Sequence, residues 1–125
     1  MSSILVIDDE VAILKFFGEI LEEGGYAVHT ASSGLEGLKI LREVPVDLVV
    51  LDLSMPEPDG FELLKSIRAS LPGLRIIVVS GFMEGALLEA ARVLGATAAL
   101  SKVDAPRLLL QTVRNILQGS RLGES

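Results

Sequence analysis

Short hydrophobic runs alternate with longer amphipathic segments along the whole chain. Residues 4–7, 48–51 and 76–79 are rich in Ile and Val, as is typical of strands buried on both faces of a sheet. Residues 26–30 and 97–101 are weaker runs of the same kind and indicate outer strands. The pattern therefore predicts five strands, with the three most hydrophobic ones at the centre of a sheet.

Between these runs, hydrophobic residues recur at helical spacing, and polar residues mark the start of several segments. Ser33 and Glu36 form a capping box, while Asp59 and Asp104 stand at positions typical of N-caps. Glycine or proline follows the first, third and fourth segments and predicts where they end. The five predicted helices cover residues 11–23, 33–43, 59–70, 84–94 and 104–118.

Strands that alternate with helices predict an α/β fold, with a parallel sheet and helices on both of its faces. Crossovers are right-handed and the most hydrophobic strands belong at the centre. The predicted topology is therefore flavodoxin-like, a doubly wound sheet of five strands in the order 2-1-3-4-5 with five helices. The chain of 125 residues suits one domain, which we expect over residues 1–118, followed by a flexible C-terminal tail over residues 119–125.

Composition and charge exclude several classes of protein. Half of the residues are hydrophobic, which is too many for a disordered chain. The formal net charge is −6 and no basic stripe occurs, so we expect no direct binding to nucleic acid. No hydrophobic run is long enough to span a membrane, and the N-terminus lacks the features of a secretory signal. Cysteine is absent, as suits a reducing compartment, and we expect a cytoplasmic protein.

Polar residues that suit a binding site follow four of the five predicted strands. Asp8 and Asp9 follow the first strand and Asp52 ends the third. Ser80 follows the fourth strand and Lys102 the fifth. Ligands of open α/β sheets bind beyond the carboxyl ends of the strands, so these residues are expected to share one cleft.

The acidic residues of this cleft indicate a cation. Two carboxylates about 4 Å apart repel each other by roughly 4 kcal/mol at an effective dielectric constant of about 20. Mg²⁺ prefers oxygen ligands and is commonly held by one or two carboxylates together with phosphate oxygens. An aspartate can also act as a nucleophile and form an aspartyl phosphate, which requires positioning and charge neutralisation. The cluster therefore predicts Mg²⁺-dependent phosphoryl chemistry.

Four segments, ILVIDDE, DLVVLDLSMPEPDG, IIVVSG and GATAALSK, occur in an order and at a spacing similar to those of a known family. Over residues 3–118 the chain resembles a response-regulator receiver domain of two-component signalling. The resemblance implies that Asp52 accepts a phosphoryl group from a sensor histidine kinase or a histidine phosphotransfer protein. It also implies that the modified chain switches a partner protein or output domain. Such a chain is a phosphoacceptor that at most catalyses its own phosphorylation and dephosphorylation, and we expect a monomer or weak dimer.

The same resemblance assigns separate roles to the residues of the cleft. Lys102 would pair with the phosphoryl group, and Ser80 would form a hydrogen bond with it. Mg²⁺ would be held by Asp8, Asp9, Asp52 and the backbone carbonyl of Ser54.

Two positions depart from the pattern of the family. Ala99 replaces the aromatic residue that usually lies three positions before the lysine, and Val103 replaces the proline that usually follows it. The cis peptide bond of that proline is therefore not expected. The site that accepts the phosphoryl group is complete in the sequence, whereas the residues that usually relay the signal are not.

Other interpretations remain open at this point. Asp8 and Asp9 could serve only as caps of the following helix, and Lys102 could be a solvated lysine. The chain could be a stand-alone regulator, a part of a longer protein, or an interaction module that is never phosphorylated. A Mg²⁺-dependent phosphatase is less consistent, because that class requires a second acid two residues after its nucleophile, where this chain has Ser54. Nucleotide binding is weaker still, since no glycine-rich phosphate loop follows a strand.

Overall fold

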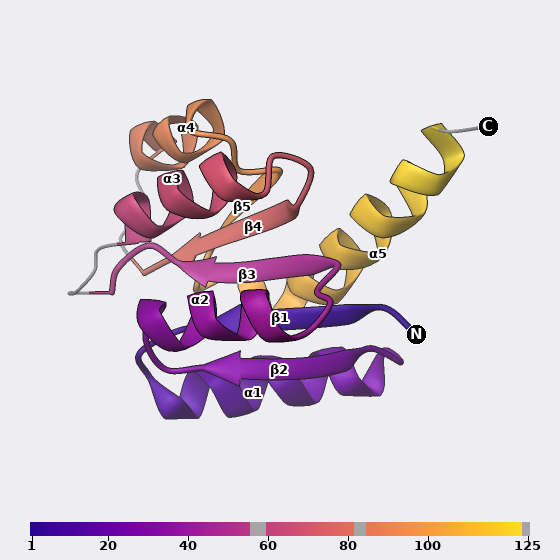
Figure 1. Ribbon diagram of the computed structural model, residues 1–125. Helices are drawn as coiled ribbons and strands as arrows, with labels where there is room; N and C mark the ends of the chain where they lie inside the picture. Colours follow the sequence, from indigo (N-terminus) through magenta and orange to yellow (C-terminus); the bar gives the residue numbers. More distant parts are fainter. Residues whose placement is uncertain (56–59, 82–84, 124–125) are drawn as a thin grey trace.

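Five parallel strands form a single sheet in the computed structural model, which describes residues 1–55, 60–81 and 85–123 (Figure 1). Their order is β2-β1-β3-β4-β5, which confirms the predicted flavodoxin-like topology. The strands are β1 (Ser3–Ile7), β2 (Ala27–Ala31), β3 (Leu48–Asp52), β4 (Arg75–Ser80) and β5 (Ala98–Ser101).

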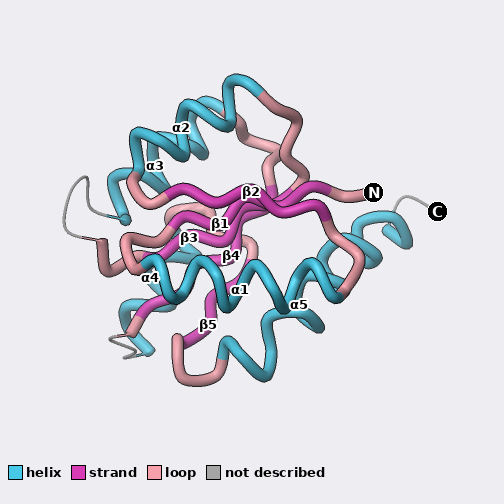
Figure 2. The backbone as a smooth tube through the Cα atoms, turned by 90° about the horizontal axis from the view of Figure 1, so that it is seen from below, coloured by secondary structure: helices cyan, strands magenta, loops and turns pink. Residues whose placement is uncertain are grey.

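Helices cover both faces of this sheet (Figure 2). They are α1 (Val11–Glu23), α2 (Gly34–Glu43), α3 (Gly60–Ser70), α4 (Gly85–Val93) and α5 (Ala105–Gly123). Helices α1 and α5 share one hydrophobic core with alternate strand residues, and α2 and α3 share a second core on the opposite face, to which α4 contributes Ala91. Within the described ranges, no helix has both the length and the hydrophobicity needed to cross a membrane.

The central strands are almost completely shielded from water. All five residues of β3 are at most 1% exposed, and Ile4 through Ile7 of β1 are fully buried. Each Å² of hydrophobic surface removed from water stabilises the fold by about 25 cal/mol, and a slip of one residue would exchange the side chains of the two faces. The core therefore fixes the strand register, and the register fixes where the polar residues after each strand lie.

Most predicted helix boundaries hold to within a residue or two. The capping box at the start of α2 is present, with the Glu36 N–H donating to Ser33 Oγ at 3.2 Å. Asp104 immediately precedes α5, and its carbonyl accepts the N–H groups of Arg107 and Leu108. Asp59, the predicted cap of α3, lies outside the described residues.

The predicted end of the last helix near residue 118 is wrong, because α5 continues to Gly123. Residues 119–123 are therefore helical. Gly25 and Gly95, which lie just beyond the ends of α1 and α4, have positive φ angles of 95° and 109°, whereas Gly119 has none. A glycine ends a helix by adopting that left-handed conformation, and one that stays right-handed costs only about 1 kcal/mol relative to alanine.

Candidate functional site

The register of β1 and β3 brings two aspartates together at the carboxyl edge of the sheet. Ile7 pairs with Leu51, so Asp8 and Asp52 follow at the same level on neighbouring strands. Both aspartates are only 1% exposed. Two buried carboxylates on adjacent strands require a positive charge nearby.

Lys102 supplies that charge. Its Nζ lies 3.1 Å from Asp8 Oδ2, 3.2 Å from Asp52 Oδ2 and 3.4 Å from Glu10 Oε1. Burial opposes the charge of the ammonium group, but the close contact with the Asp8 carboxylate and the negative charges of Asp52 and Asp8 outweigh it and raise the pKa of Lys102. Only 15% of this side chain is exposed, so the interpretation of Lys102 as a solvated lysine is wrong.

Asp8 has two carboxylate oxygens in different surroundings. Oδ1 accepts the Glu10 N–H at 2.9 Å, whereas buried Oδ2 faces the Lys102 ammonium as an ion pair without a well-aligned hydrogen bond. Burial raises the pKa of Asp8 to about 6, and the charge of Asp52 acts in the same direction. The Glu10 N–H and the Lys102 ammonium oppose this rise. A carboxyl group of this kind gains from any further cation placed beside it.

Helix capping does not account for the acidic pair. The N-cap of α1 is Glu10, which makes no side-chain capping bond. Asp8 contacts the Glu10 N–H from the preceding loop, and Asp9 is exposed. The interpretation of Asp8 and Asp9 as N-caps is therefore not supported by the geometry of α1.

The carboxylate of Asp52 is held on both sides. Oδ1 accepts the Ser54 N–H at 2.9 Å and the Ser54 hydroxyl at 2.6 Å, while Oδ2 faces Lys102. The sequence predicted a role only for the carbonyl of Ser54, so its side-chain contact was missed. The spacing was a usable signal, because an aspartate commonly accepts the N–H of the residue two positions later.

Ser80 is the last residue of β4, and it is 1% exposed. It pairs with Ser101 of β5, and its carbonyl accepts the Lys102 N–H at 2.9 Å. The backbone of β4 therefore positions Lys102 directly. Ser80 and the lysine are brought to the same edge as Asp8 and Asp52.

Carboxylate oxygens suitable for a metal ion gather beside this network. Asp8, Asp9 and Glu10 each offer an oxygen, and these oxygens lie within 4.8 Å of one another. The donor set fits Mg²⁺, which prefers oxygen ligands, and the imperfectly bonded Oδ2 of buried Asp8 supports that fit. Asp52 belongs to the Lys102 network instead of this group, and Glu10, for which the sequence indicated no definite role, takes part in both.

The two positions that depart from the family pattern have different surroundings. Ala99 packs against the core formed with α2 and α3, where its methyl group is partly buried. Val103 is 86% exposed in the turn between β5 and α5. Neither side chain contributes a polar group to the site.

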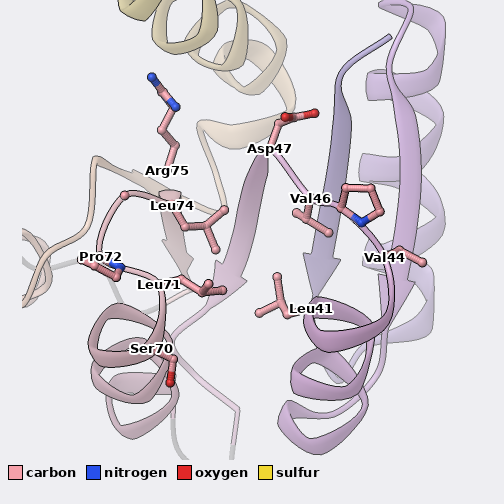
Figure 3. A pocket seen from close by; sticks show the side chains of 11 residues that line it. Leu41, Val44, Val46, Asp47, Ser70, Leu71, Pro72, Leu74 and Arg75 are labelled. Atoms are coloured by element: carbon pink, nitrogen blue, oxygen red, sulfur yellow. The ribbon is translucent and has the colours of Figure 1, made fainter.

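A cavity of about 500 Å³ lies at the opposite edge of the sheet, where β3 and β4 begin (Figure 3). Side chains of Leu41, Val46, Leu71 and Leu74 point toward it, with Asp47 and Arg75 at its rim. It is separated from Asp52 by the length of β3. The cavity is therefore distinct from the charged network.

The chain matches the family model for the response regulator receiver domain over residues 4–114. It is 38% identical over 122 residues to the sensor kinase CckA of Brucella abortus, covering 94% of this chain but only 13% of that kinase. It is 31% identical over 99 residues to the sporulation initiation phosphotransferase F of Bacillus subtilis, covering 79% of this chain and 80% of that protein. A solved receiver-domain protein from Clostridium thermocellum superposes with a TM-score of 0.89 at 33% identity, covering 98% of both chains.

The sequence matches, the strand order and the charged residues at the carboxyl edge of the sheet thus all indicate a receiver domain. Receiver domains are phosphoacceptors of two-component response regulators and generally bind Mg²⁺ at an acidic pocket. The chain belongs to the response regulator receiver domain family.

Proposed function

We propose that Asp52 is the residue of this receiver domain that accepts the phosphoryl group, and that the donor is the phosphohistidine of a histidine kinase or phosphotransfer protein. One carboxylate oxygen of Asp52 bonds to phosphorus while the P–N bond of the phosphohistidine breaks. The electron pair of that bond returns to the imidazole. In this role the chain is a substrate of its partner, and it catalyses at most its own phosphorylation and dephosphorylation.

The observation that carries this proposal is the pair of contacts around Asp52. Ser54 donates twice to Oδ1, and Lys102 faces Oδ2 at 3.2 Å, so the carboxylate is fixed in orientation and faces a cation. Phosphoryl transfer depends mainly on positioning and on neutralising the charge of the transferred group. Lys102 is well placed to follow that charge from the carboxylate to the phosphoryl oxygens.

The acidic group beside Asp52 supports a magnesium site. We propose that Mg²⁺ is held by Asp8, Asp9, Asp52 and the backbone carbonyl of Ser54. The ion would neutralise phosphoryl oxygens during transfer. Ser54 orients the Asp52 carboxylate, and Asp8 holds the ammonium of Lys102, whichever phosphoryl donor approaches.

We propose that the modified state is reported through Ser80. A phosphoryl group with close to two negative charges attracts the hydroxyl of Ser80 at the end of β4. Ala99 has no side-chain rotamer with which to fill the space this movement leaves, so β5 changes little. The response passes instead through Gly81 toward the start of α4. Residues 82–84 of this route lie outside the described part of the chain.

The partner and the compartment are also proposals. The chain spans 13% of the length of the sensor kinase CckA and 17% of that of the Escherichia coli transcriptional regulatory protein GlrR, so the activities in those names are not carried over to this chain. We propose that this chain receives its phosphoryl group in the cytoplasm and switches an output partner or domain.

Incubation with acetyl phosphate, read by intact mass, tests the assignment of Asp52. The wild type should gain one phosphoryl group when Mg²⁺ is present and none when it is chelated. Asp52→Ala should gain none. Asp47→Ala is the matched control, because it removes a carboxylate just before the other end of the same strand and should be labelled like the wild type. Labelling of Asp52→Ala at the wild-type level would refute the assignment.

A further inference from the structure

A second partly buried cation lies at the edge of the sheet opposite Lys102. Arg68, in the last turn of α3, donates four hydrogen bonds to three backbone carbonyls. Its Nε and Nη2 donate to the Gly95 carbonyl at 3.1 and 2.7 Å. Its Nη1 donates to the carbonyls of Leu71 and Pro72 at 3.2 and 2.9 Å. The planar fork of a guanidinium allows all four bonds at once, which a lysine ammonium cannot reproduce.

Gly95 is fitted to this contact by its lack of a side chain. Its φ angle is +109°, and an added Cβ would lie 2.9 Å from Arg68 Nε and 3.0 Å from Arg68 Cγ. The same glycine follows the end of α4, where the Ala96 N–H closes onto the Ala91 carbonyl at 3.0 Å. The Gly95 carbonyl, which accepts two hydrogen bonds from Arg68, is therefore part of the C-terminal cap of α4.

The segment that follows is tied to β4 by two further hydrogen bonds. The Thr97 N–H donates to the Ile76 carbonyl at 2.7 Å, and the Ile76 N–H donates to Thr97 Oγ1 at 3.0 Å. Leu94 and Ala96 pack against the core that α3 forms with the sheet. The C-terminal end of α4 is thus bonded to α3 on one side and to β4 on the other.

The bonds of Arg68 differ from those of Lys102 in their electrostatic character. Burial lowers the pKa of the Arg68 guanidinium, because desolvation disfavours the charged form. All three carbonyls that accept these bonds are neutral. Asp52 lies at the opposite edge of the sheet, so a change of its charge leaves the hydrogen bonds of Arg68 unaltered.

We infer that the contact between Arg68 and Gly95 is the fixed end of α4, so that a rearrangement begun at Ser80 displaces the start of this helix and leaves its C-terminus and the start of β5 in place. The inference rests on the proposed function, since it states how far along α4 the rearrangement proposed above extends. It identifies Arg68 as the residue that stops this rearrangement before the C-terminus of α4.

Amide hydrogen exchange of the unmodified full chain tests the anchor itself, without any phosphoryl chemistry. Arg68→Gln should raise the exchange rates of the amides of residues 95–97 by about tenfold or more, because three carbonyls lose a charged donor. Arg68→Lys keeps the charge and much of the aliphatic stem but not the fork, and it should raise the same rates by at least about threefold. Arg92→Gln, which removes an exposed arginine from the last turn of α4, is the matched control and should leave them unchanged. Equal exchange in Arg68→Lys and Arg92→Gln would overturn the anchor.

Backbone amide shifts with Mg²⁺ and beryllofluoride, a phosphoryl mimic, then test its role in the switch. In the wild type the shift changes should be large at Gly81 and Gly85, fall along α4, and vanish at residues 95–97. In Arg68→Lys they should extend through residues 95–97. Large changes at residues 95–97 of the wild type would overturn the inference, as would identical profiles in the two proteins. Absence of any response in the wild type would refute the proposed function instead, while the exchange measurement would still decide whether Arg68 is an anchor.

Discussion

Lys102 and Arg68 are both partly buried cations that join separate elements, but they lie at opposite edges of the sheet and bind opposite kinds of acceptor. Lys102 faces the carboxylates of Asp8 and Asp52, which raise its pKa despite burial. Arg68 binds neutral carbonyls, and burial lowers its pKa. The first contact depends on charges that protonation, metal binding and phosphorylation can change, whereas the second does not. We therefore call the edge that holds Lys102 responsive and the edge that holds Arg68 static.

The largest expected effect comes from removing the cation of the responsive edge. Without Mg²⁺ and at about pH 8, Lys102→Ala should lower the free energy of unfolding by about 3 kcal/mol, because two buried carboxylates lose their shared counter-charge. The loss should shrink as the pH falls below about 6, where Asp8 takes up a proton. Urea unfolding provides the measurement. Lys65→Ala, which breaks an exposed pair with Glu62, is the control, and an equal loss in both variants would contradict this electrostatic account.

Asp8 should make the stability of the wild type fall as the pH rises. The pKa of Asp8 in the folded chain is about 6, above its ordinary value of 3.8, so the folded state binds this proton more tightly than the unfolded state. Its stabilising effect is fully present below about pH 4 and is lost as the pH rises through about 6, by on the order of 2–3 kcal/mol.

Urea unfolding of the wild type and Asp8→Asn without Mg²⁺, between about pH 4 and pH 8, isolates this contribution. The wild type should lose stability relative to the variant as the pH rises. The loss caused by Arg68→Gln should stay constant over the same range, since its acceptors do not titrate. A constant difference between the wild type and Asp8→Asn would contradict the raised pKa of Asp8.

Magnesium binding should distinguish Asp9 from Glu10. Asp9→Ala should raise the dissociation constant for Mg²⁺ by about tenfold or more, equivalent to about 1.4 kcal/mol, because we propose Asp9 as a direct ligand. Glu10→Ala should raise it by about threefold or less, because we give Glu10 no direct bond to the ion. Calorimetric titration measures both constants. If Glu10→Ala raised the dissociation constant more than Asp9→Ala did, the ion would instead be assigned to the group formed by Asp8, Asp9 and Glu10.

The smallest expected effect concerns the orientation of Asp52. Ser54→Ala removes the 2.6 Å hydroxyl contact and leaves the 2.9 Å contact from the backbone N–H, so the loss of stability should be about 1 kcal/mol. Ser66→Ala, at an exposed position of α3, should change stability by less than about 0.5 kcal/mol. Urea unfolding separates the two variants. Equal losses would show that the Ser54 hydroxyl does not hold the carboxylate.

The sequence predicted the static framework well and the contacts within it less well. Residues 48–51 are apolar on both faces of a strand, so their position at the centre of the sheet followed from hydrophobicity alone. The end of α5 did not, because whether Gly119 adopts a positive φ depends on the packing around it. The sheet order also brought Asp8, Asp52 and Lys102 to one edge, as predicted.

The contacts that the sequence did not reveal are those that depend on long side chains crossing between elements. The sequence predicted that Lys102 would pair with a phosphoryl group. In the unmodified chain its ammonium already contacts Asp52 and Asp8, which lie 50 and 94 positions earlier in the sequence, because β5 ends beside these carboxylates. Arg68 bonds Gly95 across 27 residues, and no local motif marks such a pair. The available signal was a helix-ending glycine together with an arginine in the last turn of the preceding helix.

Chemical localisation of the phosphoryl group tests the central claim most directly. After reaction with acetyl phosphate and Mg²⁺, borohydride reduces an aspartyl phosphate to homoserine, and peptide mass spectrometry identifies the residue that was converted. The account predicts homoserine at position 52 alone, with none when Mg²⁺ is chelated. Conversion at position 8 or 9, or no conversion in a fully folded sample, would contradict it.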